Sequence, residues 1–212
     1  MLIGLLGFAG SGKGTVADIL VKDHNFTKIS FADALKDSVA IIFGWERHLL
    51  EGDTDESREF RETIDPWWSA RFNYNVTPRY MLQLMGTEAG RNAFHLDIWI
   101  HTVARRMMNH ENVVIADVRF PNEFQFVRES GGFNVRVVRG EEPEWYDLAW
   151  RANKEKNTDL MSEHHIHYSE WAWIGQQMNY QISNNGSLAM LEADVKHLLK
   201  VFTGPSIMNN VA

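Results

Sequence analysis

Apolar residues along the chain gather in short runs, and longer stretches with a helical spacing of apolar positions lie between them. The short runs predict five strands, namely "LIGLL" at 2–6, "FTKISF" at 26–31, "VVIAD" at 113–117, "FNVRVV" at 133–138 and "YQIS" at 180–183. The longer stretches predict helices at 13–23, 32–43, 77–86, 97–109, 121–130 and 187–202. This alternation of strands and helices predicts an α/β fold around a parallel sheet.

Two stretches interrupt the alternation. Residues 45–76 are charged and aromatic, and residues 140–175 are polar and rich in tryptophan. Both are expected to be irregular inserts and not layers of the core, because neither keeps a regular apolar spacing. The sequence therefore predicts a single domain over residues 1–212, with inserted lobes at about 45–76 and 140–175.

Composition and charge then exclude several classes of function. With 44% hydrophobic residues the chain can form a full core, yet no apolar run approaches the roughly 18 residues of a membrane span, so no membrane partner is expected. The N-terminus lacks the features of a signal peptide, and the absence of cysteine excludes disulfides and thiolate metal sites. Both fit a cytoplasmic protein, in the host cytoplasm if a phage encodes it. The net charge of −7 argues against a nucleic-acid polymer as partner.

The stretch "GFAGSGKGT" at 7–15 places four glycines between a predicted strand and a predicted helix. The spacing from Gly7 to Gly12 and Lys13 matches a phosphate-binding loop, in which backbone N–H groups converge on an anion and the lysine adds a charge. Gly14 replaces the Ser or Thr that usually follows the lysine, and Thr15 comes one position later. The ordinary alternative is a flexible turn before a helix, but the strand and helix on either side favour the phosphate loop.

This variant of the loop is similar to that of the adenylate-kinase-like nucleoside monophosphate kinases. The resemblance implies transfer of phosphate to a small anionic acceptor, with ATP as donor and Mg²⁺ as cofactor. Because the metal in such a loop can be held largely by phosphate oxygens and water, direct and water-mediated ligation by Thr15 both stay open.

A second candidate group follows the run "VVIAD". Asp117 ends this run, and the carboxyl ends of strands in a parallel sheet face the ligand crevice. We therefore expect Asp117 at the end of the central strand to face the phosphates, either through magnesium or directly at the acceptor. Arg119 follows two residues later, and Glu123 lies in the next helix. The alternative is a structural salt bridge between Asp117 and Arg119.

Other candidates have weaker signals. Arg79, Gly86, Thr87 and Trp99 lie in or near two predicted helices, where a solvated arginine and a core tryptophan are the ordinary alternatives. The histidines of "SEHHIHYSE", at 164, 165 and 167, are expected to belong to a solvated hinge, with a zinc site as the alternative. The tryptophans at 145, 150, 171 and 173 are expected to pack the second insert.

Five segments, in order over most of the chain, resemble the deoxynucleoside monophosphate kinases of tailed bacteriophages. They are the loop, "PRYMLQLMGTEAGRNAF" with "IWI", "DVRFPNEFQFVRESGGFNVRVVR", "HYSE" and "ISNNGSL". The resemblance implies a P-loop NTPase fold of three layers, α/β/α, with a parallel five-stranded sheet and inserted NMP-binding and lid lobes. Residues 45–76 are least matched, so the resemblance leaves open which bases are accepted.

The resemblance also implies roles for individual residues. Those implied to bind ATP are Gly10, Ser11, Gly12, Lys13, Gly14, Thr15, Asn184, Gly186 and Ser187, with the turn 184–187 near the donor adenine. Those implied to line the deoxynucleotide pocket are Arg79, Gly86, Thr87, Trp99, Arg119 and Glu123. Lys13, Asp117 and Arg119 are the implied catalytic residues, and Thr15 and Asp117 the implied magnesium ligands. Either Arg139 or Arg151 is expected to reach the transferring phosphoryl group from the lid.

The function that these implications describe is magnesium-dependent transfer of the γ-phosphate of ATP to a deoxynucleoside monophosphate. One alternative is another P-loop kinase of a small acceptor, of the dephospho-coenzyme A or phosphomevalonate kinase type. The other is a nucleotide-binding switch without catalysis. The expected partners are small nucleotides, and a homodimer is compatible with the resemblance.

Overall fold

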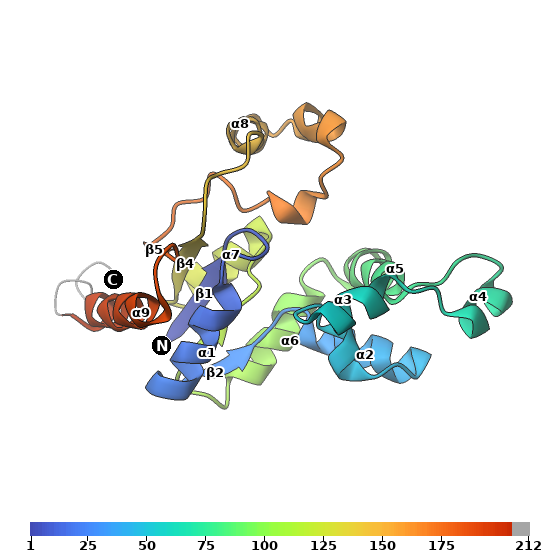
Figure 1. Cartoon of the computed structure of the whole chain (residues 1–212), viewed down its shortest axis with the longest axis horizontal. Helices are drawn as coiled ribbons and strands as arrows, with labels where there is room; N and C mark the ends of the chain where they lie inside the picture. The colour runs from blue at the N-terminus through green and yellow to red at the C-terminus, as the bar shows by residue number, and fades with distance from the viewer. Residues whose placement is uncertain (205–212) are drawn as a thin grey trace. The chain divides into compact units, whose positions relative to one another are not determined.

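The computed structural model describes residues 1–204 and contains one parallel sheet of five strands (Figure 1). The strands are β1 (Leu2–Leu6), β2 (Thr27–Ile29), β3 (Val113–Ile115), β4 (Phe133–Val138) and β5 (Tyr180–Ser183). Their order across the sheet is β2-β3-β1-β4-β5, and every neighbouring pair is parallel. The central strand is therefore β1, so the expectation that the strand before Asp117 is central was wrong. Both β1 and β3 are fully buried apolar strands, so the apolar pattern does not tell which of them is central. In the sheet, β3 lies between β1 and the edge strand β2.

Helices cover both faces of this sheet. The helices of this part of the chain are α1 (Lys13–His24), α7 (Pro121–Glu129), α8 (Tyr146–Glu155) and α9 (Leu188–Thr203). Ile3 and Leu5 of β1 are buried in one cluster with apolar residues of α1 and α9. Gly4 faces the other way, because neighbouring residues of a strand alternate, and a Cβ there would lie 2.9 Å from Val127 Cγ2 of α7. The expected three-layer α/β/α fold is thereby confirmed.

The chain forms two compact units. Unit 1 is Met1–Ser30 together with Met107 onward, and unit 2 is Phe31–Arg106. Unit 1 contains the sheet and the stretch 140–175, in which α8 is followed by the 3-10 helices η3 (Thr158–His164) and η4 (Tyr168–Glu170). Residues 205–212 of the predicted single domain lie outside the described residues. The lobe and lid roles of 45–76 and 140–175 stay predictions.

Unit 2 is helical throughout. Its helices are α2 (Asp33–Phe43), η1 (Arg47–Leu50), α3 (Asp55–Glu62), α4 (Pro66–Phe72), α5 (Pro78–Leu84), the π-helix η2 (Met85–Phe94) and α6 (Ile98–Met107), which ends one residue beyond the unit. The stretch 45–76, expected to be irregular, thus holds three short helices. Each of these helices is too short for a repeating pattern of apolar residues to be recognised in the sequence. The side chains of Thr54 and Asp65 cap the N-termini of α3 and α4. A buried cluster centred on Val39, Leu50 and Met81 joins them.

None of the helices in the described part of the chain combines the length and apolar composition that crossing a membrane requires.

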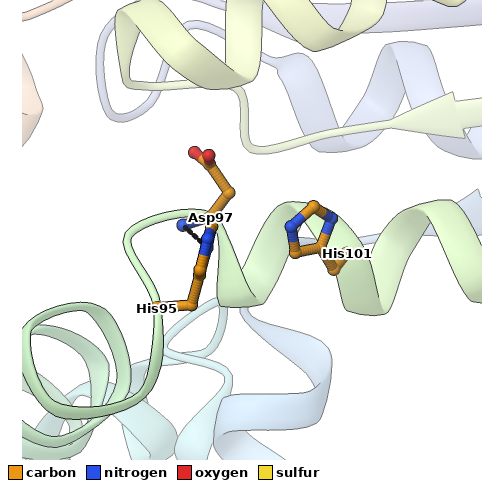
Figure 2. A group of neighbouring side chains, drawn as sticks. All are labelled: His95, Asp97 and His101. Carbon is orange, nitrogen blue, oxygen red and sulfur yellow. Dashed lines mark hydrogen bonds between the residues drawn. The ribbon is translucent and has the colours of Figure 1, made fainter.

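The start of α6 carries a local polar turn (Figure 2). The backbone N–H of Asp97 donates to Nδ1 of His95 at 3.0 Å, and the His95 and His101 rings lie 5.2 Å apart between centroids. A hydrogen bond between neighbours of this kind competes with helical bonding and favours a turn just before a helix.

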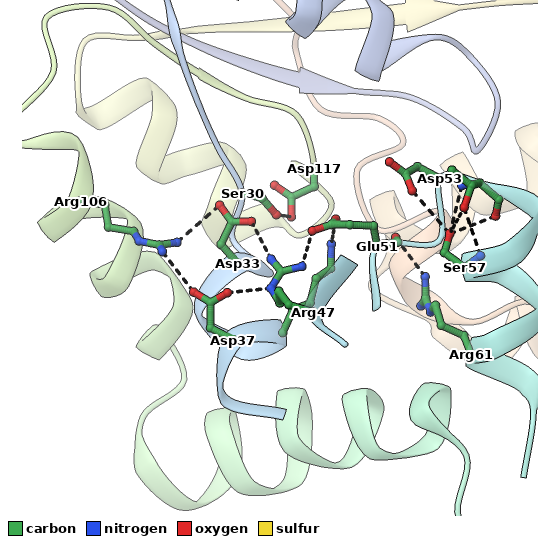
Figure 3. A network of polar contacts seen from close by, with 12 residues as sticks. Ser30, Asp33, Asp37, Arg47, Glu51, Asp53, Ser57, Arg61, Arg106 and Asp117 are labelled. Atoms are coloured by element: carbon green, nitrogen blue, oxygen red, sulfur yellow. Dashed lines mark hydrogen bonds and ion pairs between the residues drawn. The ribbon is translucent and has the colours of Figure 1, made fainter. Parts of the chain in front are cut away.

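A network of ion pairs joins α2, η1 and α6 in unit 2 (Figure 3). Arg47 pairs with Asp33 at 3.4 Å, with Asp37 at 2.6 Å, and also with Glu51. Arg106 pairs with the same two aspartates at 3.4 and 3.2 Å, and Lys36 reaches Glu51 at 2.6 Å. Burial alone would raise the pKa of Glu51, but its bonds to Lys36 and Arg47 outweigh that effect and lower the pKa below the ordinary 4.5.

The variant Glu51→Gln should lower the stability of the protein at pH 7 by about 1 kcal/mol, because the lost ion pairs are partly exposed and screened. A carboxyl with a depressed folded pKa adds stability above its unfolded value, near 4.5, and loses it as the pH falls through the folded value. The gap between wild type and variant should therefore close as the pH falls below 4.5. Urea unfolding from pH 7 to pH 3 measures this gap, with Glu59→Gln on the exposed face of α3 as control. A gap that stayed constant with pH would contradict the assignment.

Candidate functional site

The candidate site of unit 1 lies at the carboxyl ends of the parallel strands. Residues 7–12 follow β1, Ser30 follows β2, Asp117 comes two residues after β3, and Asn184 follows β5. Parallel strands present these ends at one edge, so side chains far apart in the sequence gather there. Ligands of open α/β sheets bind at this edge, where the connections on the two sides of the central strand diverge.

The conformation of the loop explains its glycines. Gly7, Gly10 and Gly12 have φ values of 137°, 77° and 98°, a region that glycine enters without steric cost. A Cβ at Gly12 would overlap the side-chain amide of Asn184, which donates to the carbonyl of Ser11 at 3.0 Å. Asn184, expected near the donor adenine, therefore fixes the loop from the end of β5.

The start of α1 offers unpaired donors. Lys13 is the first helical residue, and Gly12 before it supplies no side-chain cap. Among the described residues, Ser11 Oγ is buried without a hydrogen-bond partner. Cβ atoms at Gly10 and Gly14 would meet nothing within 4 Å, so the chain is open beside both. Free N–H groups at a helix N-terminus, an open backbone and a buried hydroxyl fit a phosphate group.

Lys13 is held against the loop itself. Its ammonium donates to the carbonyls of Gly7 at 2.8 Å and Phe8 at 2.7 Å. Burial lowers the pKa of Lys13 and the Arg119 charge adds to this, while Glu170 and Asp117 act in the opposite direction, and the result is a pKa of about 8. A phosphate beside this ammonium would favour its charged form and raise the pKa again.

Asp117 accepts a hydrogen bond of 2.6 Å from the hydroxyl of Ser30 (Figure 3). The two residues come from the ends of adjacent parallel strands, β3 and β2. Asp117 and Thr15 offer oxygen atoms, which are the donors that Mg²⁺ prefers, so these residues fit the expected metal. Ser30 had no signal in the sequence beyond its place at the end of a predicted strand.

Arg119 forms its ion pair with Glu170 of η4, at 2.7 Å. The sequence suggested Asp117 as the partner for a structural salt bridge, and gave Glu170 no role. Glu170 is the last residue of "HYSE", one of the five segments that carry the family resemblance, and that was its only signal. Arg119, Glu170 and Asp117 are all close enough to Lys13 to act on the pKa of its ammonium.

Glu123 is only 2% exposed and lies under the loop that carries Arg119. Its carboxylate accepts from the backbone N–H groups of Arg119 at 2.9 Å and Phe120 at 3.1 Å. This is the geometry of an acidic residue in the first turn of a helix, here α7, which satisfies free N–H groups there. Glu123 was expected in the acceptor pocket, and the structure places it where it orients the Arg119 backbone.

The stretch 140–175 packs on the phosphate loop. The Phe8 ring meets the rings of Trp145 and Trp173 edge-on, with centroids 5.4 and 5.0 Å apart. The guanidinium of Arg136 lies 5.1 Å from the Trp173 ring centroid. Two of the tryptophans expected to pack the insert thus contact the loop as well.

Arg139 and Arg151, the two arginines expected to reach the transferring phosphoryl group, differ in their contacts. Arg139 follows β4 and is exposed. Arg151 lies on α8, where its Nε is 4.0 Å from Glu155. These contacts do not decide between the two arginines, so the choice stays a prediction.

The remaining candidate residues belong to unit 2. Trp99 is 9% exposed, and its indole N–H donates to the carbonyl of Gly86 at 2.8 Å. A Cβ at Gly90 would lie 2.5 Å from the Trp99 ring, so the indole packs closely on the π-helix. Thr87 is exposed on the same helix, and Arg79 pairs with Glu62. Trp99 therefore supports the helix that carries Gly86 and Thr87, and its ring is not an exposed surface for stacking.

His95, Asp97 and His101 are the one group in the described part of the chain whose ligand atoms lie within 4.8 Å of one another (Figure 2). The histidines at 164, 165 and 167 do not form such a group. At His95, Nδ1 already accepts the N–H of Asp97, so in the neutral ring Nε2 carries the proton and cannot bind a metal. We assign no metal to this group.

Comparison of the sequence with curated proteins finds two relatives. One, from Acanthamoeba polyphaga mimivirus, is named a deoxynucleotide monophosphate kinase and is 36% identical over 152 residues, which are 66% of this chain and 74% of the viral protein. The other is the deoxynucleoside-5'-monophosphate kinase of Escherichia phage T5, 28% identical over 186 residues, with 64% of this chain and 74% of the phage protein covered. No family model matches the chain.

Among solved structures, a shikimate kinase from Aquifex aeolicus has a TM-score of 0.44 at 17% identity, covering 98% of this chain and 99% of its own. A dephospho-CoA kinase from Campylobacter jejuni has a TM-score of 0.43 at 12% identity, covering 94% of this chain and 96% of its own.

The variant Asn184→Ala should weaken nucleotide binding by about tenfold, because the loop loses the hydrogen bond to Ser11 and the amide packed on Gly12. Titration calorimetry with ADP measures this, and circular dichroism checks the fold. Asn109→Ala, an exposed amide before the amino end of β3, is the matched control and should bind like wild type. An unchanged dissociation constant in folded Asn184→Ala protein would remove Asn184 from the site.

Proposed function

Because this chain belongs to the deoxynucleoside monophosphate kinase family, we propose that it transfers the γ-phosphate of ATP to a deoxynucleoside monophosphate, giving ADP and a deoxynucleoside diphosphate. A phosphate oxygen of the acceptor forms the new bond to the γ-phosphorus, and the bond from that phosphorus to the β-phosphate oxygen breaks. The observation that carries the proposal is the gathering of Lys13, Asp117 and Arg119 around the loop 7–12 at one edge of the sheet.

The loop is proposed to hold the phosphates of the donor. The N–H groups at the start of α1 and the Lys13 ammonium would neutralise the β- and γ-phosphates, including the charge that moves to the leaving oxygen. Lys13 exchanges its bonds to Gly7 and Phe8 for phosphate oxygens in this step. Its low pKa reflects a partly desolvated charge, and a desolvated charge acts more strongly on a phosphate than one in water.

Asp117 is proposed to orient the reacting groups, with Ser30 fixing the carboxylate. Asp117 and Thr15 are the side chains that would hold magnesium, and the metal would supply charge that neutralises the phosphates. Arg119, oriented through its backbone by Glu123, is proposed to bind phosphate with two parallel hydrogen bonds.

Acceptor binding is proposed to involve unit 2. Thr87 is exposed there and the Arg79 side chain is partly exposed, so both are accessible to a ligand, whereas Trp99 acts through the π-helix that it supports. π-Helical segments are rare and occur frequently at functional sites, which agrees with a binding role for this helix.

The variant Lys13→Ala should fold and lose transfer by on the order of 10²-fold or more, since one partly buried countercharge to the phosphates is gone. A coupled ADP-release assay with each of the four common deoxynucleoside monophosphates and their ribonucleotides measures it. Lys22→Ala, in the exposed last turn of α1, is the control. ADP release by the wild type without any acceptor, or only with dephospho-coenzyme A, would contradict the proposed reaction.

The variant Asp117→Asn should lower kcat by at least about 10²-fold and raise KM much less, because Asn can still accept the Ser30 hydrogen bond but lacks the charge. Steady-state kinetics and thermal melting of the same sample separate the alternatives. A lowered melting temperature with normal turnover would show that Asp117 is a structural residue.

A further inference from the structure

The ion pair between Arg119 and Glu170 occupies a group that the proposed reaction needs for phosphate. Arg119 Nη1 lies 2.7 Å from Glu170 Oε1, and the two side chains are 48% and 37% exposed. A carboxylate and a phosphate oxygen take the same donor positions on a guanidinium. The Arg119 guanidinium therefore cannot give the same N–H groups to Glu170 and to a nucleotide.

Glu170 is also close enough to Lys13 for its negative charge to favour the protonated ammonium and so act to raise the Lys13 pKa. Lys13 itself donates to the carbonyls of Gly7 and Phe8. Lys13 and Arg119, the two cations proposed to bind phosphate, thus both have partners within the chain. The partners of Lys13 are backbone carbonyls, and the partner of Arg119 is the Glu170 carboxylate. A bound phosphate has to replace these partners, and the replacement lowers its net affinity.

The backbone around Glu170 is tied to the phosphate loop. The indole N–H of Trp173 donates to the Glu170 carbonyl at 3.0 Å, and Trp173 is 2% exposed. The same indole packs edge-on against Phe8, whose carbonyl accepts from Lys13. Glu170 is therefore held beside the loop by packing, and its side chain remains exposed enough to move.

We propose, on the basis of the proposed function, that Glu170 is a positioning residue that competes with nucleotide phosphate for Arg119. Phosphate binding separates Glu170 from Arg119, and the segment 140–175 that carries Glu170 is released from that contact. The chemical class of ligand is a nucleotide phosphate, from either the donor or the acceptor.

The strength of the ion pair suits this role. Partly exposed ion pairs contribute little to folding, since solvent screens them and side-chain entropy opposes them. Removing the Glu170 charge should thus leave the melting temperature almost unchanged. The same change removes an anion from the place that a phosphate would take, so its main effect should be on ligand affinity.

The test is Glu170→Gln, with binding measured by titration calorimetry in EDTA. One arm uses ADP, and the other uses each of the four common deoxynucleoside monophosphates. We expect a threefold to tenfold lower dissociation constant in at least one arm, and the arm that responds identifies whether Arg119 meets donor or acceptor phosphate. Glu163→Gln, an exposed residue of η3 that changes the net charge equally, should bind like wild type.

A double-variant cycle separates competition for Arg119 from a general change of charge. In an Arg119→Gln background, Glu170→Gln should no longer change the affinity. Glu170→Asp keeps the charge on a shorter side chain, so its dissociation constant should lie between those of wild type and Glu170→Gln. This variant replaces Glu170→Gln in the test if Glu170→Gln does not fold.

Unchanged or weaker binding by Glu170→Gln in both arms would overturn the proposal, and so would an equal gain in the Arg119→Gln background. Failure of the wild type to bind ADP at all would instead overturn the proposed function.

Discussion

The parallel direction of β1 and its neighbours is the constraint on which the candidate site depends. Because all five strands run the same way, the loop 7–12, Ser30, Asp117 and Asn184 emerge at one edge. The buried core beneath them, which α1 and α9 share with β1, fixes the strand ends to which these residues are attached. A phosphate site built from backbone N–H groups needs that rigidity, since its donors cannot adjust as side chains do.

Aromatic packing adds a second level of control over the loop. Phe8 lies within the glycine-rich segment, yet its ring packs on Trp145 and Trp173 of the stretch 140–175. The Phe8 carbonyl accepts from Lys13, so one residue links the principal cation of the loop to the segment that carries Glu170. The loop therefore combines glycines that let it approach a ligand with one large side chain that fixes its position.

Unit 2 is stabilised in a different way. A small apolar cluster is supplemented by the ion pairs of Arg47 and Arg106 with Asp33 and Asp37. Partly exposed ion pairs give orientation more than stability, and the short helices of this unit need such orientation because each buries little surface. Trp99 has a similar role for the π-helix, through one hydrogen bond and close contact with Gly90.

The sequence by itself determined the five strands, the helices that cover them and the phosphate loop. The spacing of apolar residues specifies the strands and helices, and N-caps such as Thr77 and Ser187 specify where helices begin. The loop follows from glycines, which alone tolerate its backbone conformation. All of these signals act within a few residues. Only the tertiary structure decided that Arg119 meets Glu170, 51 positions away, and that Asp117 meets Ser30, 87 positions away. It also decided that Trp99 donates to the carbonyl of Gly86 and that Glu123 accepts from the backbone of Arg119. Such pairings depend on which strands become neighbours and how side chains fill the space between them, and no local pattern of residues specifies that.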